Sequence, residues 1–169
     1  GSDKTFRSHT MNKNTTITID LAKNVFQIAV FNQAGKCKLN KAVSRNKLRE
    51  IIALYPHAKI YMEACGSAHY WARYYQEKGR FVGLIPAQIV ASYRHGNKSD
   101  KNDTLAIYES SKNQSLHLVA VKTLEQQDIS TLHSVREGFK KQRNQISNRI
   151  RGLAFEYGVL FSQSIPRLS

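Results

Sequence analysis

Apolar and polar residues alternate near the start of the chain with the period of two that is typical of a β-strand. The apolar positions of this pattern are Ile17, Ile19, Leu21, Phe26, Ile28 and Val30. The interruption predicts two strands joined by a tight turn near Lys23 and Asn24. A third strand is expected over 37–43, after a turn that contains Gly35. The first part of the chain therefore predicts an antiparallel meander.

Helical and strand patterns then alternate along the chain. The expected elements are a helix over 45–55, a strand over 58–64, a helix over 67–78, a strand over 80–85, a helix over 86–93 and a helix over about 102–111. Ser44 is the expected N-cap of the first helix, Gly79 ends the second and Pro86 occupies the first position of the third. Strands that alternate with helices after a meander predict a mixed α/β sheet.

A long helix is predicted in the last third of the chain. Thr123 and Gln126 have capping-box spacing. Apolar residues then recur at steps of three, four or seven at Leu132, Val135, Phe139, Ile146, Ile150, Leu153 and Tyr157. Two interpretations remain open: an amphipathic helix packed on its own domain, or a coiled coil with another chain or segment.

The net charge of the chain indicates what kind of partner it binds. The chain of 169 residues carries 26 Lys and Arg against 12 Asp and Glu, a net charge of +14. Such a field attracts phosphate polyanions, so nucleic acid is the expected partner. No run of about 18 apolar residues and no signal peptide is evident, so we expect no membrane association and a soluble, cytoplasmic protein. Cys37 and Cys65 lack metal-site spacing and are expected to be reduced thiols.

Four acidic residues form the candidate site. Asp20 and Glu63 each follow an apolar run, at the expected ends of two strands. Asp100 and Asp103 lie three apart in the stretch GNKSDKND. This pair fits either a polar turn, in which Asn and Asp bond to their own backbone, or half of a metal site. At the start of a helix, the spacing would place both carboxylates on one face, where the helix dipole favours them.

Divalent cations would explain why the chain brings such carboxylates together, because burying unpaired carboxylates is costly. Mg²⁺, or Mn²⁺ in its place, takes oxygen ligands and binds phosphates. Two ions about 4 Å apart can assist phosphodiester cleavage. In this scheme Asp20 bridges both ions, Glu63 holds one and the Asp100 and Asp103 pair holds the other. The ordered set indicates a ribonuclease-H-like nuclease fold.

Basic residues beside these acids are candidates for nucleic-acid binding, because cations near a metal site can position phosphates. The candidates near the acids and on the long helix are Lys23, Arg94, Lys98, Lys101, Arg136, Lys140 and Arg143, with His95 flanking the aspartates. The helix over 67–78 carries His69, which is expected on the helix surface. The same helix has three aromatic residues at helical spacing, expected in the core and at its rim: Trp71, Tyr74 and Tyr75.

Four blocks, in order, carry a resemblance to a known family: IDLAKNVFQI, MEACGSAHYWAR, LIPAQ and GNKSDKND. From about Ile17 to Leu160 the chain resembles the N-terminal domain of the DEDD insertion-sequence transposases, relatives of the Piv DNA invertase. The resemblance implies a RuvC-like fold and a metal-binding tetrad of Asp20, Glu63, Asp100 and Asp103. It also implies a prokaryotic, nucleoid-associated recombinase that moves a DNA element, in several relatives with a structured bridge RNA as guide.

The resemblance has two departures. The family commonly has a small and then an acidic residue after its last aspartate, where this chain has Thr104 and Leu105, a change expected to alter the helix surface. The family also carries a second, C-terminal domain with a serine nucleophile, so this chain is expected to be a fragment. The expected organisation is a tag remnant over 1–10, a RuvC-like catalytic domain over 11–121, a long basic helix over 122–160 and a tail over 161–169.

These observations predict the catalytic domain of an RNA-guided DNA transposase that cleaves and transfers phosphodiester strands with two metal ions and forms homo-oligomers through its long helix. An alternative is a nucleic-acid-binding and dimerisation module without its own cleavage activity. An actin-like phosphotransferase is a third interpretation, since a strand, an Asp, a turn and a strand also open that fold. It lacks the Gly-rich phosphate-binding turns and gives no reason for the charge.

Overall fold

The computed structural model describes residues 14–22, 25–97 and 99–161. The chain divides into two compact units between Thr123 and Leu124, and each unit is considered separately below. The turn expected near Lys23 and Asn24 lies outside the described residues.

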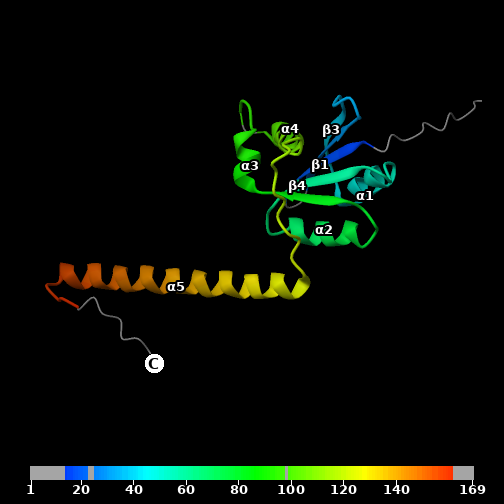
Figure 1. Cartoon of the computed structure of the whole chain (residues 1–169). Helices are drawn as coiled ribbons and strands as arrows, with labels where there is room; N and C mark the ends of the chain where they lie inside the picture. Colours follow the sequence, from blue (N-terminus) through cyan, green and yellow to red (C-terminus); the bar gives the residue numbers. More distant parts are fainter. Residues whose placement is uncertain (1–13, 23–24, 98, 162–169) are drawn as a thin grey trace, which may run out of the picture. The chain divides into compact units, whose positions relative to one another are not determined.

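The first unit is built on a mixed five-stranded sheet (Figure 1). Its strands are β1 (Thr16–Leu21), β2 (Phe26–Phe31), β3 (Cys37–Val43), β4 (Lys59–Glu63) and β5 (Val82–Ile85). The order is β3-β2-β1-β4-β5, in which β1, β2 and β3 run antiparallel and β1, β4 and β5 run parallel. The predicted meander and the ribonuclease-H-like α/β fold are confirmed.

Helices cover both faces of this sheet. They are α1 (Arg45–Ala53), α2 (Ala68–Gln76), α3 (Ala87–Ser92) and α4 (Asp100–Ser110). Figure 1 shows α2 and α4 on opposite sides of the strands. Two predicted boundaries were wrong. Pro86 precedes α3 as its N-cap instead of occupying its first turn. Helix α4 begins at Asp100, earlier than expected, because the extended backbone of Ser99 lets its side chain accept a hydrogen bond from the Asn102 N–H.

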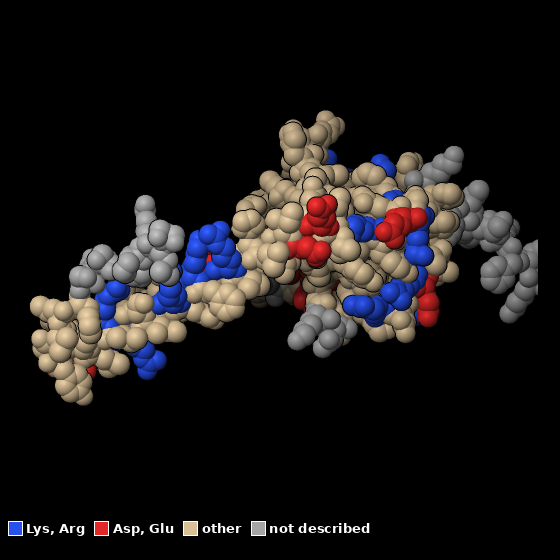
Figure 2. Space-filling view, turned by 90° about the horizontal axis from the view of Figure 1, so that it is seen from below, with Lys and Arg blue, Asp and Glu red and all other residues tan. Residues whose placement is uncertain are grey.

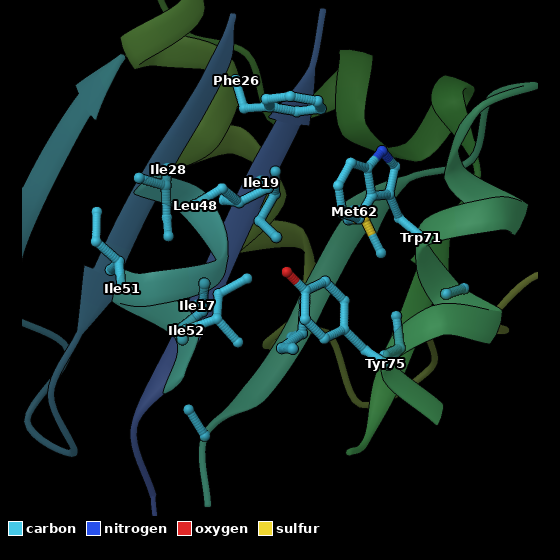
Figure 3. Packing of buried hydrophobic residues seen from close by; sticks show 14 of the residues in the cluster. Ile17, Ile19, Phe26, Ile28, Leu48, Ile51, Ile52, Met62, Trp71 and Tyr75 are labelled. Atoms are coloured by element: carbon cyan, nitrogen blue, oxygen red, sulfur yellow. The ribbon is translucent and has the colours of Figure 1, made fainter. Parts of the chain in front are cut away.

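The main core lies between the sheet and helices α1 and α2 (Figure 3). Alternate positions of β1, such as Ile17 and Ile19, are fully buried on this face. Leu48 of α1 and Trp71 of α2 cover them, and the Trp71 ring meets Phe26 edge to face with centroids 5.3 Å apart. Trp71 is a core residue, as predicted.

The opposite face of the sheet holds α3 and α4 through a smaller apolar cluster. Ile85 of β5 packs with Val90 of α3 and Ile107 of α4. Farther along α4, the ring of Tyr108 stacks on Phe31 of β2, with centroids 3.7 Å apart and an interplanar angle of 11°. Helix α4 is therefore held against the strands along its length.

The prediction of a surface position for His69 was wrong. Its side chain is buried, and its Nδ1 accepts a hydrogen bond of 3.1 Å from the backbone N–H of Lys122. Arg73, one turn later on α2, donates from Nη1 to the carbonyl of Lys122 across 2.7 Å. Because an accepting Nδ1 must be unprotonated, neutral His69 serves to hold the segment that follows α4 against α2.

The second unit contains the predicted long helix, α5 (Leu124–Glu156). None of its described residues is buried, and apolar side chains such as Leu132 and Phe139 are 69% and 66% exposed. Lys and Arg side chains gather along part of this helix (Figure 2). Among the described residues, no helix combines the length and apolarity that crossing a bilayer requires.

Candidate metal centre

Strand register brings the first two acidic residues together. The parallel pairing of β1 and β4 places Ile19 opposite Met62. Asp20 and Glu63 are the next residues of these strands. Because side chains alternate between the faces of a sheet, both point away from the main core and toward the face that carries α4. Adjacent parallel strands thus deliver two carboxylates to one edge of the sheet.

The start of α4 brings two more carboxylates to this edge. Asp100 and Asp103 occupy the first turn of the helix, where unpaired backbone N–H groups favour negative charge. Carboxylate oxygens of Asp20, Asp100 and Asp103 all lie within 4.8 Å of one another. Asp103 is buried, Asp20 is half-buried and Asp100 is exposed. The stretch GNKSDKND therefore supplies a helix start whose two aspartates meet the end of β1.

A network of polar side chains fixes α4 in this position. The hydroxyl of Thr18 on β1 donates to the carbonyl of Thr104 across 2.9 Å. The Thr104 hydroxyl lies 3.2 Å from Oδ1 of Asn40 and 2.8 Å from the carbonyl of Lys101. Asn40 of β3 also accepts from Nε2 of Gln27 on β2 at 2.7 Å. Three neighbouring strands thus hold the helix turn that carries Asp103.

This network corrects the expectation for Thr104. Its side chain was expected to change the helix surface, but it is fully buried. The network joins residues up to 86 positions apart, so sequence spacing could not reveal it. The signal that was available is the polarity of Thr18, Gln27 and Asn40 within strands, where a polar side chain on a covered face needs a hydrogen-bonding partner.

Arg94 forms ion pairs with two acids of the cluster. Its Nε donates to Oδ1 of Asp103 across 2.5 Å, and its Nη2 lies 4.0 Å from Oε2 of Glu63. Arg94 follows α3 in the chain, and its side chain is only 25% exposed. One guanidinium thus contacts the acids from both β4 and α4.

The charge of the cluster perturbs Asp20. Burial is the largest cause that raises the pKa of this carboxyl from 3.8 to about 6. The negative charges of Asp103, Asp100 and Glu63 raise the pKa further, in that order, and Arg94 lowers it. The other three acids of the cluster therefore all act electrostatically on Asp20. Arg94 alone does not compensate the repulsion at Asp20.

The donor set fits a hard divalent cation. Carboxylate oxygens are the ligands that Mg²⁺ and Mn²⁺ take, and a cation would relieve the repulsion that raises the pKa of Asp20. Asp20, Asp100 and Asp103 have the mutual spacing to share an ion. Glu63 lies at the end of the adjacent strand, next to the same arginine. The metal roles of the four residues remain a prediction.

The structure places the candidate nucleic-acid-binding residues in different surroundings. Lys101 is exposed at the start of α4, beside the cluster, whereas Arg94 is engaged by carboxylates. Lys23 and Lys98 lie outside the described residues. Arg136, Lys140 and Arg143 are in α5, where Lys140 pairs with Glu137 at 2.7 Å. His95, at 3.4 Å from Glu109, faces α4 away from the metal candidates.

The sheet order and its flanking helices define a domain of the ribonuclease-H-like fold class, with an acidic cluster at the end of its central strand. Residues 17–158 match the model of the IS110-type DEDD transposases, described as "Transposase", and the chain belongs to this family. This family membership confirms the resemblance read from the four sequence blocks. It also contradicts the interpretation of the chain as an actin-like phosphotransferase.

Individual relatives agree with the family assignment. The chain is 38% identical over 144 residues to a "Probable family 20 transposase" of Pseudomonas aeruginosa, covering 85% of this chain and 43% of the relative. It is 35% identical over 161 residues to the "Transposase for insertion sequence element IS1111A" of Coxiella burnetii, and the match covers 95% of this chain and 44% of that relative. A transposase for IS1328 of Yersinia enterocolitica is 36% identical over 153 residues, covering 90% and 45%. The chain thus spans less than half the length of these relatives.

Proposed function

We propose that the first unit is the metal-dependent, phosphodiester-cleaving domain of a DNA transposase. The observation that carries this proposal is the meeting of three carboxylates within 4.8 Å at the end of the central strand of a ribonuclease-H-like sheet. Membership of a transposase family supports this reaction class, the cutting and joining of DNA strands of an insertion sequence.

In this proposal each acidic residue has a defined task. Asp20 would serve as a ligand of both cations, Glu63 would hold one, and Asp100 with Asp103 would hold the other. Divalent cations bound there supply activation of the attacking oxygen and stabilisation of the leaving oxygen of a phosphodiester. The hydrogen bond from Thr18 to the Thr104 carbonyl, and the one that the Thr104 hydroxyl donates to Asn40, keep the helix turn of Asp103 in place against the strands. Preorganised ligands of this kind lower the cost of assembling the site.

Arg94 gives the cluster a counter-ion that belongs to the chain. Its contacts with Asp103 and Glu63 reduce the repulsion among the acids before a cation binds. Divalent cations held there would supply this charge instead, and Arg94 would then be able to bind a DNA phosphate beside the site. Lys101 lies exposed on the same helix turn and serves the same phosphate-rich surface.

The second unit supplies further contacts in this proposal. Residues 136–151 of α5 contain six Lys and Arg but only one acidic residue, Glu137. These cations contact the backbone of DNA or of a structured guide RNA. The exposed apolar residues of α5 form a coiled coil with a second copy. Membership of a transposase family supports DNA as a partner, and the charge of +14 suits a nucleic-acid backbone of either kind.

A cleavage assay tests the proposed chemistry. The chain is incubated with branched DNA in Mg²⁺ or Mn²⁺, in parallel with Asp20→Ala and with Glu109→Gln, which removes an acid of α4 outside the cluster. We expect nicking that requires the metal, disappears in Asp20→Ala and persists in Glu109→Gln. Equal nicking by Asp20→Ala would refute the assignment. Salt-sensitive binding without nicking by any variant would favour the alternative, a binding module that does not cleave by itself.

A further inference from the structure

A basic cleft of about 380 Å³ lies between the C-terminal ends of α1 and α2. Its lining includes Arg49, Ile52, Tyr74, Tyr75, Lys78 and Arg80. Arg80 lies just before β5, whereas Glu63 ends β4, so the cleft and the acidic cluster lie at opposite ends of these parallel strands. They also lie on opposite faces of the sheet, because α1 and α2 cover the face away from α4. The cleft is therefore separate from the metal centre.

The charge of the cleft is uniformly positive. Three cations line it, and no Asp or Glu is among the described residues that form its lining. Within the described part of the chain, neither Arg49 nor Lys78 forms an ion pair. Its volume falls in the range of small-ligand sites, about 300–1,000 Å³. A cleft with three cations and no counter-ion suits an anionic group.

Aromatic rings hold two of these cations without using their hydrogen-bond donors. The guanidinium carbon of Arg49 lies 5.1 Å from the ring centre of Tyr74 and 5.8 Å from that of Trp71. Nζ of Lys78 lies 4.9 Å from the ring centre of Tyr74. The buried Nε of Arg49 has no hydrogen-bond partner among the described residues. A cation–π contact orients the charge and leaves its N–H groups for an acceptor.

Tyr75 also lines the cleft and belongs to the adjoining core. Its side chain is 3% exposed, and its buried hydroxyl has no hydrogen-bond partner in the described residues. Figure 3 shows the ring reaching from α2 toward Ile52 of α1. Burial raises the pKa of this phenol to about 12, so it keeps its proton at neutral pH. Buried polar groups are almost always satisfied, and an orphaned hydroxyl calls for an acceptor.

Arg80 forms a fixed wall of the cleft. Its guanidinium donates to the carbonyl of Ile52, at 3.3 Å in the last turn of α1, and to the carbonyl of Tyr55, at 2.5 Å just after the helix. Arg80 thereby ties the approach to β5 to the end of α1. The other two cations, which are held only by ring contacts, are the ones free to meet a ligand.

We propose that this cleft binds a backbone phosphate of a nucleic-acid strand, with Arg49 and Lys78 as the charged donors and the Tyr75 hydroxyl as the neutral donor. Arginine matches two phosphate oxygens at once, and the net charge of +14 favours a polyanion over a small metabolite. The site requires neither divalent cations nor cleavage. It gives the domain a second grip on a strand, at the end of the sheet away from the acidic cluster.

Binding of a labelled twelve-residue oligothymidylate to the full chain in EDTA tests this proposal. EDTA chelates divalent cations, so binding through the candidate metal centre does not contribute to the measured affinity. The double variant Arg49→Gln with Lys78→Gln removes two charges from the cleft. The matched control, Lys112→Gln with Lys47→Gln, also removes two charges. Lys112 lies 4.7 Å from the ring centre of Tyr108, as Lys78 lies over Tyr74, but it is outside the cleft.

We expect the cleft variant to bind the oligothymidylate about tenfold more weakly. A plot of the logarithm of the binding constant against the logarithm of the salt concentration should also become less steep by about 0.7, the value for one phosphate contact on a single strand. The control should bind within about threefold of the unchanged protein. Equal losses in the two variants would overturn the proposal. Lys78→Gln alone, at an exposed position, provides the same comparison if the double variant is poorly folded.

Tyr75→Phe separates a binding role of the hydroxyl from a structural one. This change keeps the ring and removes the unpartnered hydroxyl, so thermal stability should stay equal or rise while oligothymidylate affinity falls severalfold. Unchanged affinity would overturn the role of Tyr75. A final arm adds inorganic phosphate at constant ionic strength. Weak competition, only above millimolar concentrations, supports a strand phosphate, and tight competition by free phosphate would show a small-anion site instead.

Discussion

The Nε of Arg94 donates to Oδ1 of Asp103 across 2.5 Å, and the same guanidinium lies 4.0 Å from Oε2 of Glu63. Two acids from different elements thus share one internal counter-ion. A cation that binds these carboxylates must compete with this arginine. Cation binding at the candidate metal centre would therefore depend on the position of this one side chain.

Arg94→Gln is expected to tighten Mg²⁺ binding by about tenfold, since each 1.4 kcal/mol of lost competition is a factor of ten and charge-assisted hydrogen bonds contribute about that much. The melting temperature in EDTA should fall, because the repelling acids lose their counter-ion. Titration of the thermal shift with Mg²⁺ measures both effects. Lys101→Gln removes an exposed charge from the same region and should change Mg²⁺ affinity less than threefold. Weaker Mg²⁺ binding in Arg94→Gln would show that the arginine supports the ion instead of competing with it.

The raised pKa of Asp20 predicts how stability depends on pH when metal is absent. The folded pKa of about 6 exceeds the ordinary 3.8, so the folded state retains this proton between the two values. The stabilising effect of this proton is complete below pH about 4 and is lost as the pH rises through about 6. Asp20→Asn should therefore match the unchanged protein at pH 4 in EDTA and become more stable at pH 7. The expected gain is on the order of 1 kcal/mol after allowance for solvent screening.

Urea unfolding over this pH range measures the difference, with Asp128→Asn on the exposed surface of α5 as the control. Addition of Mg²⁺ at pH 7 should reverse the order, because the cation stabilises only the protein that keeps the aspartate. A stability difference that is constant from pH 4 to pH 7 would contradict the electrostatic account of the cluster.

The bond from Thr18 to the Thr104 carbonyl predicts a coupling between sheet stability and metal binding. Thr18→Val keeps the shape of the side chain but leaves a buried carbonyl without this donor, at a cost of about 1–3 kcal/mol. Mg²⁺ affinity should fall at the same time, because α4 loses a fixed contact with β1. Thr131→Val removes a comparable 2.9 Å bond to the Gln127 carbonyl on exposed α5. This control should stay within about 0.5 kcal/mol in chemical unfolding. Unchanged stability in Thr18→Val would mean that packing alone positions α4.

Gly83→Ala is expected to destabilise the first unit. An added Cβ would lie 2.7 Å from Cδ1 and 2.8 Å from Cε1 of the Tyr61 ring on the neighbouring strand β4. Overpacking of this kind costs about 1–3 kcal/mol. Gly138→Ala in α5 meets no atom within 4 Å and should stabilise that helix by about 1 kcal/mol. Thermal unfolding of the two variants checks the pair, and a stable Gly83→Ala protein would show that the Tyr61 ring can move aside.

Local patterns were sufficient for much of the fold. The alternation through Ile17 and Ile19 predicted β1. The point where this alternation stops predicted that Asp20 lies at the end of the strand. The spacing of Asp100 and Asp103 predicted their common helix face. These inferences succeed because strand and helix periods are short-range properties of the chain.

Long-range contacts account for what the sequence left open. The Thr18 to Thr104 bond, the engagement of Arg94 by Asp103 and the burial of His69 under Lys122 each depend on how separate elements pack. The start of α4 was misplaced because the cap at Ser99 was not recognised. The order of strands in the sheet placed Glu63 beside Asp20, a relationship that spacing along the chain does not contain.

A crystal structure of the full chain grown at pH 7.5 with Mn²⁺, with the ion located by its anomalous scattering, tests the central claim most directly. The account predicts a Mn²⁺ peak at coordination distance, about 2.0–2.3 Å, from the carboxylates of Asp20 and at least one of Asp100 and Asp103, with Arg94 displaced from Asp103. Arg94 still bonded to Asp103, with no Mn²⁺ at these carboxylates under saturating conditions, would contradict it.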